Sequence, residues 1–405
     1  MSRLQELGFD SLCIKDAELD GQHSHVPPIY ATSTFVYGDL DKALAYFQGN
    51  SDAYVYSRLG NPSVNSVAEK IAALESFGLL NEHGQPLRAF GQLFGSGMGA
   101  IAAATAGILT SGDKILTQGN LYGTSNELFT SMLPNFGIDC VIANLKDLEH
   151  IENALINDER IQLIYIETPA NPTLECFDIE AITVIAQNFG VKVVVDNTFA
   201  SPYLQQPLKY GVDLVVHSST KYLNGHGTGL TGAVVGCNEQ LVNIAVKNMQ
   251  KMFGACASPF EAYLLNNGIK TLGLRMERHC DNAEKLAYFL ETNPRVEKVN
   301  YLSLINHPDH ALAKDQMKRF GGMLSFEVKG GQEAALNFLR NLKFCTLTAS
   351  LGTPDTLVQH PATMSHVKMH PEQRLQYGIT EGLIRVSVGL ENIEDIVDDF
   401  DRALI

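Results

Sequence analysis

Residues 213–232 read DLVVHSSTKYLNGHGTGLTG. The apolar run 214–216 is short and β-branched, and polar residues follow it, which is typical of a buried strand that ends in a loop. The loop presents three hydroxyl side chains, at positions 218–220, directly before Lys221. Such hydroxyls can hydrogen-bond a phosphate, and the lysine amine can form a Schiff base with a carbonyl. Most lysines in Gly-rich turns are solvated surface residues, so a catalytic role for Lys221 depends on the other motifs of the chain.

Segments of strand and helix character alternate through the middle of the chain. The expected strands are 114–117, 139–143, 161–167, 191–195, 214–217 and 232–236, and the expected helices between them are 122–135, 145–157 and 179–189. This alternation favours an α/β fold with a mostly parallel sheet covered on both faces. Ligands of such sheets bind at the C-terminal ends of the strands, where Glu167, Asp196 and Lys221 are expected to lie.

We expect three regions in the chain. Residues 1–70 form an irregular, aromatic-rich arm with a short helix at 39–48, and the arm docks on a neighbouring subunit because an undocked terminus is usually disordered. Residues 71–271 form the large, ligand-binding domain, in which 76–93 are expected to be irregular. Residues 272–405 form a smaller α+β domain, with expected helices and strands at 275–291, 296–301, 322–328, 332–339, 384–388 and 391–404.

The composition argues against several classes of protein. The net charge is -15 and no Lys/Arg-rich run is present, so we expect neither nucleic acid nor a membrane surface as a partner. We see no apolar run long enough to span a bilayer and no signal peptide. The seven cysteines are dispersed without a C-x-x-C pair, which predicts reduced thiols in a cytoplasmic protein and no metal site.

A glycine-rich turn, FGSGMGA at 94–100, leads into an Ala-rich helix. The N-terminus of such a helix offers free N–H groups and the positive end of a dipole to a phosphate. The turn also half-matches a dinucleotide-binding fingerprint, which would indicate a Rossmann oxidoreductase. That interpretation is weaker, because the third fingerprint glycine is missing and the next strand ends in Gln118 instead of an acid.

Two further polar residues follow expected strands. Asp196 ends the apolar run 193–195 and could bind a ribose, a metal or a protonated ring nitrogen. With Lys221 only 25 positions away, the ring-nitrogen role is favoured, because a carboxylate keeps a pyridinium protonated. Asn171, in the Pro-rich loop 167–172, could hydrogen-bond a phenolic oxygen or belong to an ordinary turn.

The motifs at 95–100, 167–172, 194–198 and 217–229 together resemble those of a known family. This family is the pyridoxal-phosphate-dependent enzymes of cysteine and methionine metabolism, which includes methionine γ-lyase, O-acylhomoserine sulfhydrylase and the cystathionine γ-lyases and γ-synthases. The resemblance extends from about residue 22 to the C-terminus. It implies pyridoxal 5'-phosphate as the cofactor and the aspartate aminotransferase-like, fold type I architecture of PLP-dependent transferases.

The resemblance also implies how the cofactor is bound. Lys221 would hold it as a Schiff base, and Asp196 would pair with its ring nitrogen. Tyr122 would stack on the ring and act as an acid toward the leaving group. The phosphate would be bound from within the subunit by Gly97, Met98, Ser218 and Thr220, and from a neighbouring subunit by Tyr56 and Arg58. The catalytic unit would then be a dimer, and two such dimers would form a homotetramer.

The substrate carboxylate would be held by Arg385, according to the same resemblance. Ser350 and Asn171 would support this arginine and the phenolic oxygen of the cofactor. The implied chemistry is elimination or replacement of the γ-substituent of a sulfur amino acid or an O-acylhomoserine, because the cofactor stabilises a carbanion at the α-carbon.

The choice of substrate is implied by a few positions. Ala349 stands where enzymes that act on cystathionine generally carry a glutamate, and 357–366 and 377–391 look most like methionine γ-lyase. Thr124 and Thr228 stand where the methionine-specific enzymes typically carry cysteine and aspartate. The HGT pattern that includes Thr228 is more like that of the O-acetylhomoserine sulfhydrylases. We therefore expect a methionine γ-lyase, with an O-acetyl- or O-succinylhomoserine sulfhydrylase and a cystathionine enzyme as alternatives. A non-catalytic, cofactor-binding regulator is the alternative from a different class.

Overall fold

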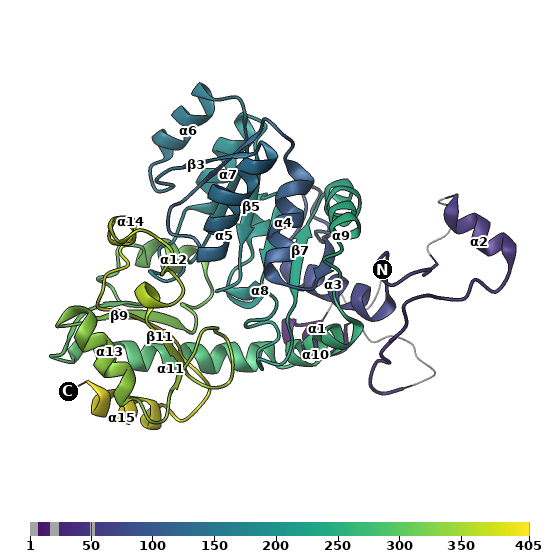
Figure 1. Ribbon diagram of the computed structural model, residues 1–405. Coiled ribbons are helices and arrows are strands. Elements are labelled where there is room, and N and C mark those ends of the chain that lie inside the picture. Colours follow the sequence, from purple (N-terminus) through teal and green to yellow (C-terminus); the bar gives the residue numbers. More distant parts are fainter. Residues whose placement is uncertain (1–6, 17–23, 49, 51–52, 405) are drawn as a thin grey trace.

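A seven-stranded sheet forms the centre of the larger part of the molecule (Figure 1). Its spatial order is β1-β7-β6-β5-β4-β2-β3, and β6, β5, β4, β2 and β3 run parallel to one another. Only β7 is antiparallel to its neighbours β6 and β1. The mostly parallel sheet expected from the sequence is confirmed. The strands are β1 (Phe90–Phe94), β2 (Lys114–Thr117), β3 (Asp139–Ile142), β4 (Ile161–Glu167), β5 (Lys192–Asp196), β6 (Leu214–His217) and β7 (Gly232–Gly236).

The computed structural model describes residues 7–16, 24–48, 50 and 53–404. The expected arm 1–70 and the start of the family resemblance near residue 22 thus lie partly outside the described residues. Helices of the first part of the chain are α1 (Phe9–Lys15), α2 (Leu40–Phe47), α3 (Pro62–Glu75), α4 (Gly97–Ile108), α5 (Gly123–Glu127), α6 (Leu148–Asn157), α7 (Ile179–Asn188), α8 (Ser201–Leu204), α9 (Lys247–Phe253) and α10 (Pro259–Ile269).

Both faces of the sheet are covered by helices, which explains its continuous β-branched strands. In β5, Val193 and Val195 belong to the core on the side of α3, α6 and α7, whereas Val194 belongs to the core on the side of α4. Local signals start several of the helices. Asn61, Ser96, Asp147 and Asp178 each accept a backbone N–H at the first turn of α3, α4, α6 and α7.

A second, five-stranded sheet occupies the C-terminal part in the order β10-β11-β12-β9-β8. It is antiparallel except for the β10–β11 pair, and Phe326, Phe338 and Phe400 pack as ring pairs in the core beside it. The predicted domain boundary at 272 coincides with the first residue of α11, but the division into domains stays a prediction. The elements are α11 (Leu272–Thr292), β8 (Val296–Asn300), α12 (His310–Gln316), β9 (Met323–Val328), α13 (Gly331–Asn341), β10 (Thr346–Leu347), β11 (Leu357–Gln359), α14 (Pro371–Gln376), β12 (Leu383–Ser387) and α15 (Ile393–Ala403).

Two expectations for secondary structure were wrong. Residues 76–93 are not irregular throughout, because 90–94 form the edge strand β1, which pairs with β7. The expected helix 122–135 is broken into α5, a π-helical turn at Leu128–Met132 and a 3-10 turn at Leu133–Phe136. Pro134 lies in the last of these turns, where its ring and missing N–H prevent continuation of an α-helix.

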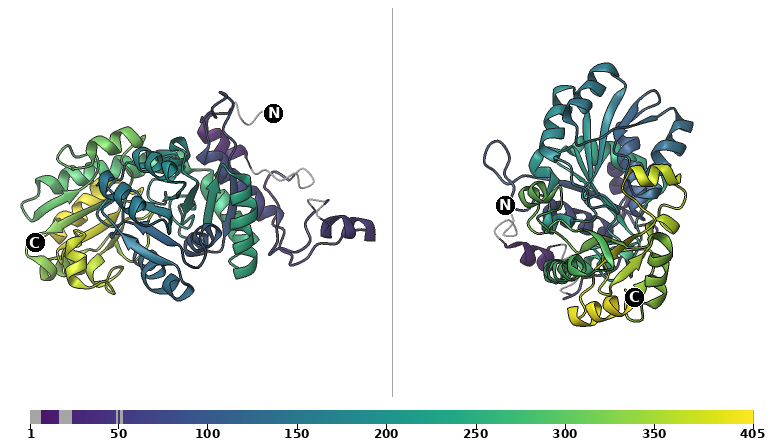
Figure 2. Two further views of the ribbon diagram at one scale, coloured as in Figure 1. Left: turned by 90° about the horizontal axis from the view of Figure 1, so that it is seen from above. Right: turned by 90° about the vertical axis from the view of Figure 1, so that its left-hand side faces the viewer.

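The arm that carries α2 extends away from the rest of the chain, at the end opposite the C-terminal sheet (Figures 1 and 2). The expected helix at 39–48 is confirmed as α2, and Asp39 caps it. Its apolar side chains are not buried by the described residues, since Leu40 and Phe47 are 72% and 71% exposed. In the described part of the chain, no helix combines the length and the apolar character needed to cross a membrane.

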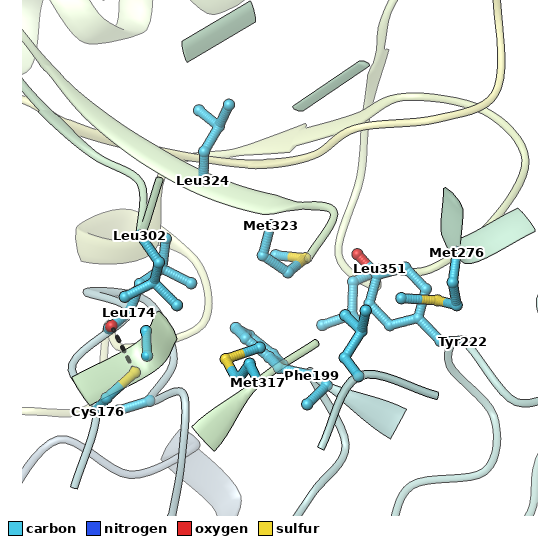
Figure 3. Close-up of a cluster of buried hydrophobic side chains, with 14 of the residues drawn as sticks. Leu174, Cys176, Phe199, Tyr222, Met276, Leu302, Met317, Met323, Leu324 and Leu351 are labelled. Atoms are coloured by element: carbon cyan, nitrogen blue, oxygen red, sulfur yellow. Dashed lines mark hydrogen bonds between the residues drawn. The ribbon is translucent and has the colours of Figure 1, made fainter. Parts of the chain in front are cut away.

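A cluster of apolar side chains joins the two sheets close to the Lys221 loop (Figure 3). Tyr222 follows Lys221 directly, and Leu351 follows Ser350. Both belong to the same core as Met323 and Leu324 of β9 and as Phe199, which comes shortly after β5. The loops that carry Lys221 and Ser350 are therefore each held by a neighbouring side chain that packs into this core.

Asp399 of α15 provides a test of the C-terminal part. Its carboxylate is 1% exposed and accepts the backbone N–H groups of residues 343–345 at 2.9–3.0 Å. Asp399→Ala leaves three donors without an acceptor and is expected to lower the free energy of unfolding by about 3 kcal/mol, measured by urea unfolding. The control Asp398→Ala, at an exposed position of the same helix, should change it by less than about 0.5 kcal/mol. Equal effects of the two changes would contradict the structure.

Candidate active site

The carboxyl ends of β4, β5 and β6 lie next to one another and form the base of the site. Glu167 is the last residue of β4, Asp196 is the last residue of β5, and β6 ends at His217. Glu167 pairs in register with Asp196, and Asp196 pairs with Val216. Because the strands are parallel, side chains far apart in sequence meet at this edge, as expected from the sequence.

Asp196 is buried and accepts two hydrogen bonds. The Thr198 N–H and the Tyr165 hydroxyl donate to Oδ1 and Oδ2, both at 3.0 Å. Burial raises the pKa of the Asp196 carboxyl, while the hydrogen bonds from Thr198 and Tyr165 lower it. These two hydrogen bonds stabilise the ionised carboxylate. It lies at the strand ends, where a cationic group of a ligand can bind.

Glu167 is a second buried carboxylate, whose role the sequence did not reveal. Its Oε2 accepts the Tyr122 N–H at 2.8 Å, and its Oε1 accepts the Asn171 N–H at 3.0 Å. Burial and the neighbouring Asp196 charge raise the pKa of Glu167. The Gln118 side chain donates to the Glu167 carbonyl oxygen at 2.7 Å and accepts the Glu167 N–H at 3.0 Å. Glu167 thus positions two of the predicted site residues, Tyr122 and Asn171, through their backbones.

Lys221 lies in the loop after β6, and its Nζ donates a hydrogen bond of 2.9 Å to Ser350 Oγ. Burial, and after it the positive charge of Arg385, lowers the pKa of the Lys221 amine to about 8. A substantial fraction of this amine is therefore neutral near physiological pH. The amine can act as a nucleophile toward a carbonyl, or as a base.

Arg385 of β12 is buried, and burial lowers the pKa of its guanidinium to about 10. Nη1 donates to Asn171 Oδ1 at 3.1 Å, and Nη2 donates to the Ser350 carbonyl oxygen at 2.6 Å. Ser350 has a φ of 134°, which is costly for a residue other than glycine, and both of its oxygens are engaged. The predicted residues Lys221, Ser350, Arg385 and Asn171 thus form one connected set.

Gln359 of β11 is a contact of Arg385 that the sequence did not reveal. With its amide oxygen turned toward the guanidinium, Gln359 accepts from Nε, Nη1 and Nη2 of Arg385 at 3.2, 3.1 and 3.3 Å. A glutamine that follows a strand-like run carries no signal of its own. Only the register of β11 against β12, in which Gln359 pairs with Arg385, identifies this contact.

The glycine turn before α4 meets the Lys221 loop at very close range. A Cβ atom at Gly97 would lie 2.7 Å from the Ser218 Cβ, and one at Gly232 would lie 2.1 Å from the Ser96 oxygen. Ser218 donates its N–H to Thr198 Oγ1 at 2.8 Å. The start of α4 and the Ser218 side chain are thus in direct contact, and a helix N-terminus beside a hydroxyl suits a phosphate.

Not every predicted residue joins this set. The Thr220 hydroxyl donates to the Thr231 carbonyl and accepts the Thr231 N–H, both at 3.0 Å, so it holds the loop to β7. The Tyr122 side chain is 43% exposed at the start of α5. Arg58 lies over the Tyr56 ring at 5.6 Å and donates to the Lys251 carbonyl at 2.9 Å. Among the described residues, neither Tyr56 nor Arg58 hydrogen-bonds to the Lys221 loop.

Comparison with known proteins identifies the family of the chain. The sequence model of the family described as "Cys/Met metabolism PLP-dependent enzyme" matches residues 10–405. The chain is 46% identical to an L-methionine gamma-lyase of Fusobacterium nucleatum subsp. nucleatum over 93% of this chain and 92% of that protein. It is 38% identical to an O-succinylhomoserine sulfhydrylase of Pseudomonas aeruginosa, with 100% and 96% covered. The solved cystathionine gamma synthase of Xanthomonas oryzae pv. oryzae in complex with cystathionine superposes with a TM-score of 0.89 at 35% identity, covering 98% of each chain.

The low pKa of Lys221 leads to a prediction for the cofactor-free protein. Competitive acetylation with trace acetic anhydride between pH 6 and 11, read by peptide mass spectrometry, should give a midpoint of about 8 for Lys221. The pKa is lowered, so the reactive neutral amine gains population as the pH rises through 8. Arg385→Gln should raise this midpoint by a fraction of a pH unit, because burial is the larger cause, and Arg385→Lys should keep it low. A midpoint at the ordinary value of 10.5 would contradict the buried position of the amine.

Proposed function

Because the chain belongs to the Cys/Met metabolism PLP-dependent enzymes, we propose that it eliminates or replaces the γ-substituent of a sulfur amino acid at the strand ends of the seven-stranded sheet. The single observation that carries this proposal is the connection of Lys221 to Arg385 through Ser350. It links an amine of low pKa to a guanidinium of the second sheet. The Lys221 amine can react with a carbonyl, and the Arg385 guanidinium can bind a substrate carboxylate.

The residues of the site fit pyridoxal 5'-phosphate. The start of α4 and Ser218 suit a phosphate, and no side chain can replace the hydrogen of Gly97 without meeting Ser218. The Ser219 hydroxyl is buried and has no partner among the described residues. Asp196 suits a protonated ring nitrogen, and Lys221 suits an aldehyde. The site therefore offers a partner for each functional group of the cofactor, with Asn171 facing the phenolic oxygen in this proposal.

The residues of the chain divide the chemistry among them. The bound cofactor supplies an electron sink that stabilises negative charge at the substrate α-carbon. Arg385 binds the substrate carboxylate and orients the α-hydrogen, and Asn171 and the Ser350 carbonyl hold the guanidinium in place. Lys221, with its pKa of about 8, takes up the α-proton as a base. Tyr122 donates a proton to the leaving sulfur.

Methionine is the substrate that the comparisons favour. The methionine gamma-lyase of Fusobacterium nucleatum is 46% identical, whereas the sulfhydrylase of Pseudomonas aeruginosa is 38% identical. The sulfhydrylase alternative is favoured by the HGT pattern at Thr228, and Thr124 also departs from the methionine-specific enzymes, as the sequence indicated. Thr124 lies exposed on α5, two residues after Tyr122, and the Thr228 hydroxyl is 3.2 Å from Asn224 Oδ1 in its own loop.

We propose further that the enzyme acts as a homotetramer of two catalytic dimers. The support is the arm, where Val36, Leu40 and Phe47 are 95%, 72% and 71% exposed and need a partner surface. Docking of the arm on a second copy would bring Tyr56 and Arg58 to the phosphate of the neighbouring site. All seven cysteines carry free thiols, and a cytoplasmic location suits them.

The substrate is tested with purified, cofactor-loaded protein. Methionine alone should give methanethiol, 2-oxobutanoate and ammonia, because the site carries a base, an acid and a carboxylate anchor for elimination. Lys221→Ala should slow this reaction by about 1,000-fold or more, since it removes both the covalent anchor and the base. A parallel assay uses O-acetylhomoserine and sulfide. Homocysteine from that mixture, with methionine left intact, would make the enzyme a sulfhydrylase.

The shared active site is tested by mixing two inactive variants. Arg58→Ala and Lys221→Ala are co-expressed in equal amounts and purified together. If Arg58 acts on the neighbouring site, each mixed dimer has one intact site, and roughly a quarter of the unmodified activity should return. If Arg58 acts within its own subunit, both sites of a mixed dimer carry one defect and no activity returns. Each variant purified alone is the control and should remain inactive.

A further inference from the structure

A buried carboxylate with an incomplete set of hydrogen bonds lies behind the site. Glu75, the last residue of α3, is 0% exposed. Its Oε1 lies 2.6 Å from His217 Nε2 and accepts the Asn197 Nδ2–H at 3.0 Å. Its Oε2 has no partner among the described residues. An ionised carboxylate in such a position is strongly unfavourable unless a positive charge lies beside it.

The contacts of Glu75 reach the three loops that hold the proposed active site. His217 directly precedes Ser218, and Asn197 directly follows Asp196. The Asn197 amide also donates to the Gln205 carbonyl at 2.8 Å, and Gln205 Nε2 donates to the Thr168 carbonyl at 3.0 Å. Thr168 directly follows Glu167. One polar network of Glu75, His217, Asn197 and Gln205 therefore contacts the end of each of β4, β5 and β6.

His217 is the group that can supply the missing positive charge. It is 1% exposed, and its Nε2 points at the Glu75 carboxylate. Asp196 of β5 pairs in register with Val216, the residue before His217. On its other side Asp196 pairs with Glu167 of β4, and its carboxylate accepts the Tyr165 hydroxyl. A positive charge on His217 would lower the pKa of the Asp196 carboxyl and oppose the effect of burial. A proton on His217 would thus stabilise the ionised forms of two carboxylates, Glu75 and Asp196.

We propose that Glu75 and His217 form a buried ion pair that positions and charges the active site: Glu75 keeps His217 protonated, and the cationic His217 keeps Asp196 ionised. This inference rests on the proposed function, since it gives Asp196 the ring nitrogen of the cofactor as its partner. Glu75 and His217 touch neither substrate nor cofactor in this scheme. They are positioning residues that act through Asp196 and through the loop of Lys221.

The alternative is that the pair is a neutral hydrogen bond with a structural role only. Charge and structure can be separated by substitutions that keep the shape. Glu75→Gln keeps an oxygen acceptor for Asn197 but removes the negative charge that holds the proton on His217. His217→Gln keeps an N–H donor toward Glu75 but removes the positive charge. Both changes remove the cation next to Asp196, whereas a purely structural role would be largely preserved by either one.

The experiment follows the visible absorption of the cofactor-loaded protein as a function of pH. Without the His217 charge, the pKa of Asp196 rises, the carboxyl takes up a proton and the ring nitrogen loses its own. The neutral ring nitrogen then no longer repels a proton on the cofactor-bonded nitrogen of Lys221. That nitrogen therefore keeps its proton to higher pH. We expect the midpoint of the spectral titration to move upward by about one pH unit in each single variant. The double variant should show the same shift as either single variant, because the two residues act as a unit.

A matched control separates this effect from a general loss of stability. Asp399→Asn changes another buried carboxylate, far along the chain, that binds backbone N–H groups in the C-terminal part. It should lower the midpoint of urea unfolding and leave the spectral midpoint unchanged. Spectral midpoints of Glu75→Gln and His217→Gln that equal that of the unmodified protein would overturn the proposal. A downward shift in Glu75→Gln would overturn it too, because His217 would then hold its proton without Glu75.

One measurement needs no variant and covers the case in which the substituted proteins do not fold. A neutron structure of the unmodified, cofactor-loaded protein is expected to show deuterons on both ring nitrogens of His217 and none on Glu75. A single deuteron on the His217 ring would overturn the proposal. The proposed function fails in a different way: a protein that forms no coloured complex with pyridoxal 5'-phosphate would contradict the site itself. A coloured complex with unmoved midpoints contradicts only the ion pair.

Discussion

The buried guanidinium of Arg385 is the constraint on which the geometry of the site depends. A cation removed from water needs acceptors at close range, and here these come from three separate parts of the chain. Asn171 follows β4 of the large sheet, Ser350 lies between β10 and β11, and Gln359 ends β11. Because Ser350 also accepts from Lys221, the position of the guanidinium determines the position of the amine. The second sheet is thereby held against the strand ends of the first.

Burial is also the common cause of the chemistry that the site can perform. It lowers the pKa of Lys221 and Arg385, and it raises the pKa of Asp196 and Glu167, because in each case the charged form is disfavoured. The apolar cluster of Tyr222, Leu351 and β9 helps to exclude water at this point (Figure 3). The same burial forces every carboxylate to find donors nearby. The network of Glu75, His217 and Asn197 behind the strand ends follows from this requirement.

The sequence analysis identified the strands that carry the site motifs, but it missed an edge strand and the end of one helix. Short β-branched runs followed by polar residues identified β4, β5 and β6 and placed Asp196 and Lys221 at one edge, because that pattern has a direct structural meaning. The edge strand β1 was missed, since FGQLF is only partly buried and does not alternate. The helix expected at 122–135 keeps α-helical geometry only to Glu127, and Pro134 lies in the 3-10 turn that ends the segment, which the apolar pattern concealed. The dinucleotide interpretation of the glycine turn is replaced by membership of the PLP-dependent family.

The sequence by itself determined the alternation of strands and helices, the order of the motifs and the family, and with the family the cofactor. These follow from local signals, which each segment carries within a few residues. Only the tertiary structure decided that Ser350 joins Lys221 to Arg385, that Glu167 positions Tyr122 and Asn171, and that Glu75 faces His217. The partners in these contacts lie 35 to 142 residues apart, except for Glu167 and Asn171, which are four residues apart. Such pairs are created by strand order and by the packing of two sheets, and no local pattern encodes them.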